Sequence, residues 1–223
     1  MSESLHFAEH TLQEMALVFM GIVYILRVRW FLSFKAGKER QAATGSSNTT
    51  PKKGILYSWV NIAMPWAMES TRSKPFMYIQ FIIFHLGVVA AIGHSFIVPY
   101  AKGLAASANY VLILQIFTGA AFLVGVLRLI RRFGDKYMRA ISTPDDYFSL
   151  ILLTVWFFCA FLAAPHNLVD GETVELTFFW MTAFFLIYVP FSKISHYLYY
   201  PFTRFYFGKS MGHRGVYPMQ RGK

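Results

Sequence analysis

Five apolar stretches in this sequence are each long enough to cross a lipid bilayer as a helix. A bilayer core about 30 Å thick needs about 20 helical residues, because each residue adds about 1.5 Å. The stretches are Leu12–Phe34, Phe76–Ala101, Leu104–Ile130, Tyr147–Pro165 and Val174–Tyr200. Only 14% of the residues are charged, whereas a soluble domain usually has about 25%. We therefore expect an all-α integral membrane bundle of five transmembrane helices.

The basic residues predict how these helices are oriented. The formal net charge is +10, and if the loops alternate between two sides, every Lys and Arg except Lys102 falls on one side. Loops rich in Lys and Arg face the cytoplasm. We expect the N-terminus outside, the C-terminus in the cytoplasm, and a multi-pass protein of the cell's inner (cytoplasmic) membrane. The distribution explains the net charge without a nucleic-acid partner.

The segments outside the spans predict little further structure. Residues 35–75 form a cytoplasmic linker, in which apolar residues at helical spacing between Ile55 and Trp66 predict an interfacial helix over 55–70 that Pro65 can break. Its tryptophans would anchor it at the membrane surface or form a docking site. Residues 205–223 form a basic cytoplasmic tail that is too short to fold alone. Residues 1–204 are thus expected to be one transmembrane domain.

The single cysteine limits the redox groups that this chain could hold. Cys159 lies in the middle of the fourth span, and one cysteine cannot form an intrachain disulfide. An iron–sulfur cluster usually takes four thiolates. Any such cluster must therefore belong to a partner subunit.

Histidines within the spans indicate a functional site, because an ionisable side chain in a bilayer is costly and usually functional. His85 lies in the second span, and His196 lies at the cytoplasmic end of the fifth. Both are expected in the inner half of the bilayer. Neutral imidazole is a good axial ligand for haem iron, and facing helices of a bundle commonly hold a cofactor. The spacing predicts that these two residues bind one haem b.

His94 has three possible roles. It lies about 13 Å nearer the outer face than His85 by helical rise, and no histidine of the fifth span matches that depth. Nine residues turn an ideal helix through half a circle, so His94 should face away from His85 unless a bulge intervenes. It could ligate an outer haem, accept a proton from a quinol, or only bond a neighbouring carbonyl or serine. Gly87 and Gly93 would let a porphyrin approach the backbone.

Several motifs resemble the gamma subunit of respiratory nitrate reductases. The segments that carry the resemblance are Phe84-His85-Leu86-Gly87 and Ile92-Gly93-His94 of its second helix, Val189–His196 of its fifth helix, and Arg131-Arg132-Phe133 and Arg139–Thr143 of its basic loop. The likeness spans most of the chain from Leu12 to Arg204, without the linker Gln41–Ser70. The variant Asp145-Asp146-Tyr147 is similar to relatives in heterodisulfide-reductase-like and sulfite-reductase-associated membrane complexes.

The resemblance implies a b-type cytochrome that exchanges electrons with menaquinone or ubiquinone and with cytoplasmic iron–sulfur subunits. Carried over by motif, His85 and His196 match the ligand pair of the inner haem. His94 matches a ligand of the outer haem, and Gly93 matches a position near the quinone pocket. Lys102 could contribute to that pocket. The subunit that holds the terminal substrate site would be another chain, so no catalytic residue is assigned here.

Two departures from the family pattern concern the outer haem. The interval between the second-helix histidines is one residue shorter, and Phe178 stands where the other outer ligand is expected. His10 and His166, both at the outer face, are alternative ligands, and a second haem is our working hypothesis. Four basic residues are candidate partners for haem propionates, because arginine forks suit carboxylates; they are Arg131, Arg132, Lys193 and Arg204.

Two other classes of function stay open. A haem-free membrane anchor would need no cofactor residues at all. A proton-relay transporter would use the intramembrane histidines to carry protons. Such transporters more often have acidic residues within their spans, and here the Asp and Glu residues other than Glu14 are expected in loops, terminal segments or membrane margins.

Overall fold

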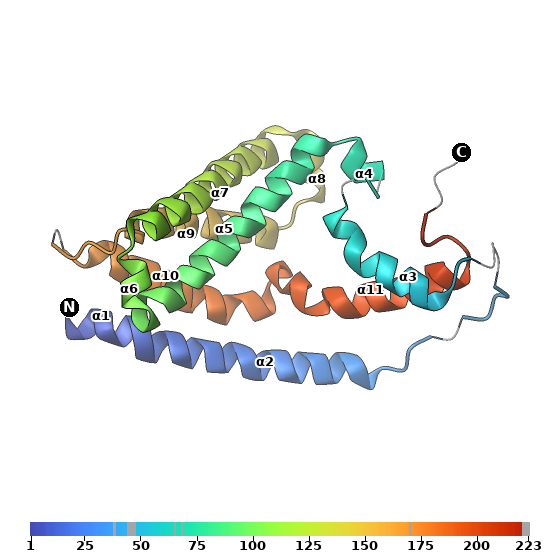
Figure 1. Cartoon of the computed structure of the whole chain (residues 1–223), viewed down its shortest axis with the longest axis horizontal. Helices are drawn as coiled ribbons and strands as arrows, with labels where there is room; N and C mark the ends of the chain where they lie inside the picture. Colours follow the sequence, from blue (N-terminus) through green and yellow to red (C-terminus); the bar gives the residue numbers. More distant parts are fainter. Residues whose placement is uncertain (38, 44–47, 65, 68, 170, 220–223) are drawn as a thin grey trace. The chain divides into compact units, whose positions relative to one another are not determined.

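The computed structural model describes residues 1–37, 39–43, 48–64, 66–67, 69–169 and 171–219. Every regular element in these ranges is a helix (Figure 1). The chain divides into two compact units, which are described separately. The first unit comprises Met1–Tyr24 and Gln80–Ile194, and the second comprises Ile25–Ile79 and Ser195–Lys223.

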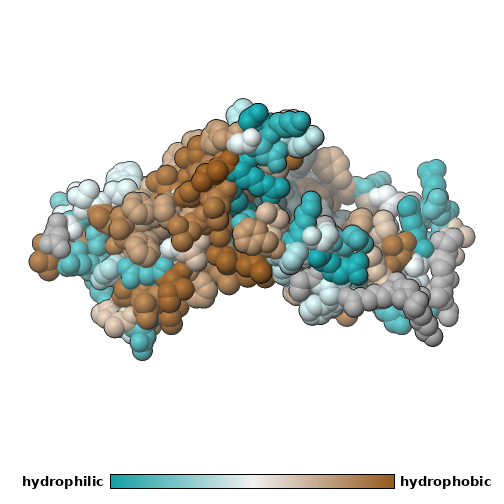
Figure 2. All heavy atoms as spheres, turned by 90° about the horizontal axis from the view of Figure 1, so that it is seen from above, coloured by the Kyte–Doolittle hydropathy of each residue, from teal (hydrophilic) through white to brown (hydrophobic). Residues whose placement is uncertain are grey.

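Five helices of the described chain are long and apolar enough to cross a membrane. They are Glu3–Ser33, Pro75–Tyr100, Ala108–Gly134, Pro144–Ala163 and Thr173–Phe191. Apolar side chains cover much of the visible surface of the first unit (Figure 2). The predicted all-α architecture with five membrane-spanning helices is confirmed, and the chain is a multi-pass membrane protein that contacts the lipid bilayer.

The first unit contains most of the membrane-spanning helices. Its elements are α1 (Glu3–Phe7), the π-helical turn η1 (Ala8–Leu12), the start of α2 (Gln13–Ser33), most of α5 (Pro75–Tyr100), α6 (Lys102–Ala105), α7 (Ala108–Gly134), α8 (Lys136–Ile141), α9 (Pro144–Ala163), α10 (Thr173–Tyr188), the 3-10 turn η3 (Val189–Phe191) and most of the 3-10 turn η4 (Lys193–Ser195). α9 packs against both α7 and α10. A Cβ added at Gly87 of α5 would lie 2.2 Å from the Cβ of Ala121 in α7, so these helices touch where both residues are small.

The core of this unit is aromatic. Trp156, Phe157, Phe178 and Phe179 are each at most 1% exposed. The indole nitrogen of Trp156 donates a hydrogen bond to the hydroxyl of Thr182 at 2.9 Å, which satisfies the one polar atom of that side chain. Large rings in contact bury much apolar area, so this layer fixes α9 against α10.

The second unit is built on a close contact between α3 (Pro51–Val60) and α11 (His196–His213). A Cβ added at Gly54 would lie 2.3 Å from the carbonyl oxygen of Gly208, and one added at Gly212 would lie 2.4 Å from that of Thr50. Small residues four apart let two helices approach to backbone contact. This unit also contains the 3-10 turn η2 (Asn61–Ala63) and α4 (Glu69–Arg72).

The structure corrects three predicted boundaries. The fifth span does not continue to residue 200, because α10 ends at Tyr188 and Pro190, which has no backbone N–H to donate, lies in the 3-10 turn that follows. The interfacial helix predicted over 55–70 begins earlier, at Pro51, where the Thr50 side chain caps it, and its helical run ends at Ala63. The predicted break at Pro65 lies outside the described residues.

The third correction concerns the C-terminal tail. The boundary predicted between residues 204 and 205 falls inside α11, which runs to His213. The segment is helical because α3 packs along it through the glycine contacts described above. The tail is therefore part of a folded helix pair.

Candidate functional site

His85 presents the nitrogen geometry expected of a metal ligand. It lies half-buried on α5, and its Nδ1 is 2.7 Å from the carbonyl oxygen of Phe81, one turn earlier. Because a carbonyl can only accept a hydrogen bond, Nδ1 must carry the proton. The lone pair then belongs to Nε2, which is the nitrogen that iron would bind. Metal-ligating histidines commonly have their other nitrogen fixed by such a bond.

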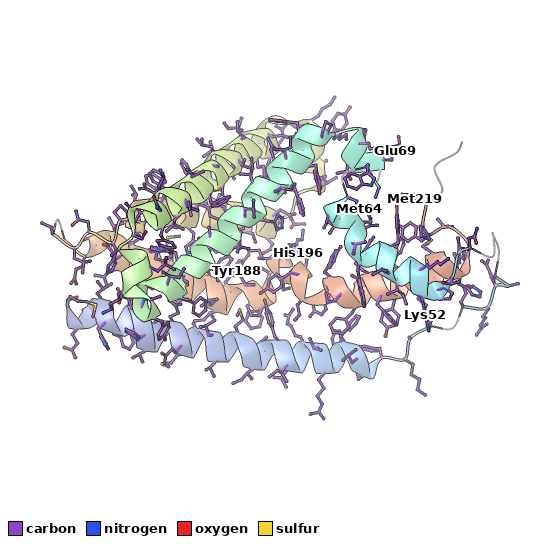
Figure 3. The ribbon with its side chains drawn as sticks, viewed as in Figure 1. Lys52, Met64, Glu69, Tyr188, His196 and Met219 are labelled. Carbon is purple, nitrogen blue, oxygen red and sulfur yellow. The ribbon has the colours of Figure 1, made fainter. Side chains whose placement is uncertain are left out.

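His196 is the predicted partner of His85, and its setting differs from the expected one. It is the first residue of α11 (Figure 3), and its side chain is exposed. The turns Val189–Phe191 and Lys193–Ser195 separate it from α10, so it begins a new helix instead of ending the fifth span. His85 belongs to the first unit and His196 to the second, and their pairing stays a prediction.

Arg128 lies over the ring of Phe84, the residue that precedes His85, and was missed in the sequence analysis. Its guanidinium carbon is 5.0 Å from the centre of the Phe84 ring, and Phe84 and His85 have ring centroids 6.3 Å apart. Arg128 is half-buried on α7, and none of the described residues forms an ion pair or a side-chain hydrogen bond with it. Its position inside an apolar helix, one turn before the basic loop, is the signal that could have singled it out.

Most of the four basic residues predicted to bind propionates form side-chain hydrogen bonds with described residues, which Arg128 does not. Lys193 Nζ is 2.8 Å from Asp146 and 2.9 Å from the Thr143 hydroxyl. Arg132 donates to the Ser142 hydroxyl at 2.7 Å. These bonds join the start of α9 to the neighbouring loops, so they have a structural role whatever else they bind.

Arg204 and Arg131 complete this set. Arg204 donates to the Ser58 carbonyl at 3.0 Å and to the Asn61 side chain at 3.1 Å, which fixes it in the contact between α3 and α11. Arg131 is exposed at the end of α7. Arg204 therefore stabilises the second unit, and its predicted role toward a propionate stays untested.

His94 is packed and hydrogen-bonded within the first unit. Its side chain is 1% exposed, and its Nδ1 lies 2.9 Å from the hydroxyl of Tyr110 on α7. The main chain of Ala163 is a second polar neighbour of the ring. α5 is one uninterrupted α-helix from Pro75 to Tyr100, so no bulge turns His94 toward the face that carries His85.

Phe178 fills the space beside His94. The two ring centroids are 5.3 Å apart, and Phe178 is fully buried and stacked on Trp156 at 6.3 Å. A porphyrin bound to His94 would need this space. The residues present therefore fit an inner haem at His85 better than an outer haem at His94.

Gly87 and Gly93, the two glycines near these histidines, have different surroundings. Gly87 is buried against Ala121, so the contact with α7 explains its small size. At Gly93, an added Cβ would have no described heavy atom within 4 Å. This surface next to His94 is open to a flat molecule such as a quinone ring.

His10 and His166, the alternative ligands predicted for an outer haem, lie in η1 and shortly after α9, respectively. His10 stacks near His6 at 4.8 Å and meets Tyr100 edge-on at 5.6 Å. His166 follows α9 with a φ of 46°, and its Nδ1 is buried without a hydrogen-bond partner. Burial and the nearby Lys102 lower the pKa of His166, so its neutral form is favoured.

Two carboxylates that the sequence places in the N-terminal segment and at a membrane margin are buried in this unit. Glu9 in η1 is 1% exposed and Glu175 in α10 is 3% exposed, and η1 packs against α10. One oxygen of each has no hydrogen-bond partner, and the same holds for the amide oxygen of Gln13. Lys102 is the nearest basic influence on Glu9. π-Helical turns are frequent at functional sites, and this one was not foreseen.

Within the described ranges, no group of three or more His, Cys, Asp or Glu side chains is placed to hold a bare metal ion. A bis-histidine haem needs only two axial ligands from the protein. This observation therefore leaves the haem prediction untested.

Comparisons with known proteins yield one distant relative. No family model matches the chain, and no solved structure matches it. The chain is 28% identical over 184 residues to a protein of Nitratidesulfovibrio vulgaris strain Hildenborough, which is named only "Protein". The aligned part covers 81% of this chain and 80% of the relative. The likeness extends over most of both chains, and the relative's name states no activity.

Proposed function

We propose that this chain is the haem-b-bearing membrane subunit of a multi-subunit oxidoreductase and transfers electrons between membrane quinone and a cytoplasmic iron–sulfur subunit. The observation that carries the proposal is the hydrogen bond from His85 Nδ1 to the Phe81 carbonyl within an apolar helix. This bond leaves the lone pair on Nε2, as an iron ligand requires. The resemblance to the gamma subunits of nitrate reductases supports the same role.

In this proposal His85 and His196 hold the haem iron, which supplies one-electron chemistry when bound. Arg128 is our candidate to bind a propionate, because it is half-buried and no described carboxylate neutralises it. We favour Arg128 over Arg204 as the partner of a propionate, because the Arg204 guanidinium is already bonded to Ser58 and Asn61.

The quinone head would bind beside Gly93 and His94. A quinol gives up two electrons and two protons, and His94, bonded to Tyr110, can accept a proton at its ring. His166 and Glu9, near Lys102, lie toward the outer surface and could hold a proton on its way out. Because Phe178 packs against His94, we favour this role for His94 over ligation of a second haem.

A visible absorption spectrum tests the proposal directly. The purified protein should show a haem b band in the dithionite-reduced minus oxidised spectrum, with about one haem per chain. His196→Leu should abolish most of this band, whereas His213→Leu, at the other end of the same helix, should retain it. A preparation of the intact complex without any haem would refute the assignment.

The proton-relay transporter is a second candidate, and the buried Glu9 and Glu175 favour it. Buried carboxylates near a membrane face can carry protons. The protein would then move protons into vesicles without haem or quinol. A pH-sensitive dye would report the proton flux. Loss of that flux in Glu9→Gln and in Glu175→Gln would support the transporter. If the protein shows neither haem nor proton flux, the remaining function is a haem-free membrane anchor.

A further inference from the structure

A pocket of about 1040 Å³ lies within the second unit. It is lined by the end of α2, the segment that follows α2, and the last two turns of α11. Pockets that bind small molecules have volumes of about 300–1000 Å³. The space is therefore large enough for a lipid headgroup together with the adjoining part of its acyl chains.

One side of the pocket is basic. Lys35 and Lys209 line it, and no described carboxylate pairs with either. Arg214, also in the lining, forms an ion pair with Glu39 at 2.9 Å, and this bond lowers the pKa of the Glu39 carboxyl. That pair is neutral as a unit, so the two lysines give the pocket its positive charge.

Another part of the pocket lining is aromatic and lies at the end of the first membrane-spanning helix. Phe31 and Phe34 line it, and they flank Ser33, the last residue of the first membrane-spanning helix. Phe31 is held by Tyr199 and Phe202, with ring centroids 5.8 and 5.6 Å away. The chain leaves the apolar layer here, at the depth where lipid headgroups lie.

We propose that this pocket binds the phosphate of an anionic phospholipid, with Lys35 and Lys209 on the phosphate and Phe31 and Phe34 against the glycerol and acyl chains. A free phosphate would use only the basic side. The aromatic side beside a helix end is the reason to assign a lipid. Basic residues next to membrane helices commonly select anionic lipids. The site is independent of any haem.

Native mass spectrometry of the full-length protein in detergent tests this site. Phosphatidylglycerol is titrated into the wild type and into the double variant Lys35→Gln with Lys209→Gln. Each basic residue at an anionic surface contributes about fivefold in binding, so the double variant should bind about twenty-fivefold more weakly. Phosphatidylcholine with the same acyl chains should bind weakly to both proteins.

A matched control removes the same charge elsewhere in the second unit. Lys52, labelled in Figure 3, and Lys74 are exposed and do not line the pocket. Lys52→Gln with Lys74→Gln should bind phosphatidylglycerol as the wild type does. Equal losses in the two double variants, or none in the pocket variant, would overturn the proposal. If inorganic phosphate at millimolar concentration displaces the lipid completely, the pocket is a phosphate site and the lipid assignment fails.

Discussion

The two histidines of α5 show how one helix can offer two different chemical sites. His85 is half-buried, with Nδ1 bonded to its own helix, and Arg128 lies over the ring of the preceding residue, Phe84. His94 is fully buried, bonded to Tyr110 of another helix, and covered by Phe178. The first arrangement fixes one ring nitrogen within the helix that carries the histidine. The second uses the imidazole to hold two helices together.

This difference follows from the geometry of an unbroken helix. Nine residues place the two side chains on opposite faces, and α5 has no bulge that would bring them to one face. A histidine that meets the packed interior must satisfy its polar atoms there. We infer that His85 and His94 have different functions. The following experiments test that inference, from the largest expected effect to the smallest.

Replacing His85 should have the largest effect. His85→Gln removes the imidazole while keeping a polar side chain, and the haem b band should disappear because an axial ligand is lost. His213→Gln, in the second unit, is the control and should retain the band. Haem content measured by pyridine haemochrome decides between the outcomes, and an unchanged content in His85→Gln would remove this residue from the site.

His94→Gln should leave haem content unchanged and slow the reduction of the haem by quinol. Loss of a group that transfers protons typically costs about 10²–10⁴-fold in rate. Stopped-flow reduction by a menaquinol analogue measures this rate, and Tyr110→Phe should give a smaller decrease. If instead half of the haem is lost, His94 is a ligand of a second haem and the two sites are more alike than we propose.

Phe178→Ala should destabilise the outer site without changing the inner one. Removing a fully buried phenylalanine costs about 3–5 kcal/mol, which should lower the thermal midpoint in detergent. Phe184, on the same helix, is 48% exposed and Phe178 is 0% exposed, so Phe184→Ala is the matched control and should change little. Equal midpoints for the two variants would contradict the packing described here.

Arg128→Gln should keep the haem but lower its midpoint potential. A nearby positive charge stabilises the reduced haem, which carries one more electron, so removing that charge should shift the potential downward by about several tens of millivolts. Redox titration followed in the visible range measures the shift. Arg131→Gln, exposed on the next turn, should have a much smaller effect.

The smallest expected effect is a pH dependence that arises from His166, shortly after α9. Burial lowers the pKa of His166 below its ordinary value of 6.5, so the folded protein favours neutral His166. The resulting stability is fully present above pH 6.5 and is lost as the pH falls toward the lowered pKa. Thermal midpoints measured from pH 8 to pH 5 should decline less in His166→Gln. The same slope in both proteins would exclude His166 as the source.

The sequence was sufficient to predict the number of spans, because apolar length is nearly all that a bilayer requires. The fifth span was placed too long, since residues 189–200 are mostly apolar or aromatic whether or not the helix continues. Their periodicity does not reveal that a 3-10 turn begins at Val189. The pairing of α3 with α11 was also missed, because Gly54 is far in the chain from Gly208 and Gly212 and no local pattern links them.

The candidate site was predictable only in part. Histidine is rare in spans, so its presence alone pointed to His85 and His94. The contacts that separate their roles come from residues without a local signal, such as Phe81, Tyr110 and Phe178. Burial of Glu9 and Glu175 depends on how η1 meets α10, and no sequence pattern states that contact.

The glycine contact between α3 and α11 has a consequence for the order of assembly. Trp59 on α3 donates to the carbonyl of Pro201, 142 residues later in the chain. During synthesis α3 emerges well before its partner, and the later membrane helices must be made before α11 exists. The helix pair can therefore close only at the end of biosynthesis, and a chain truncated before residue 196 would leave the glycine face of α3 uncovered.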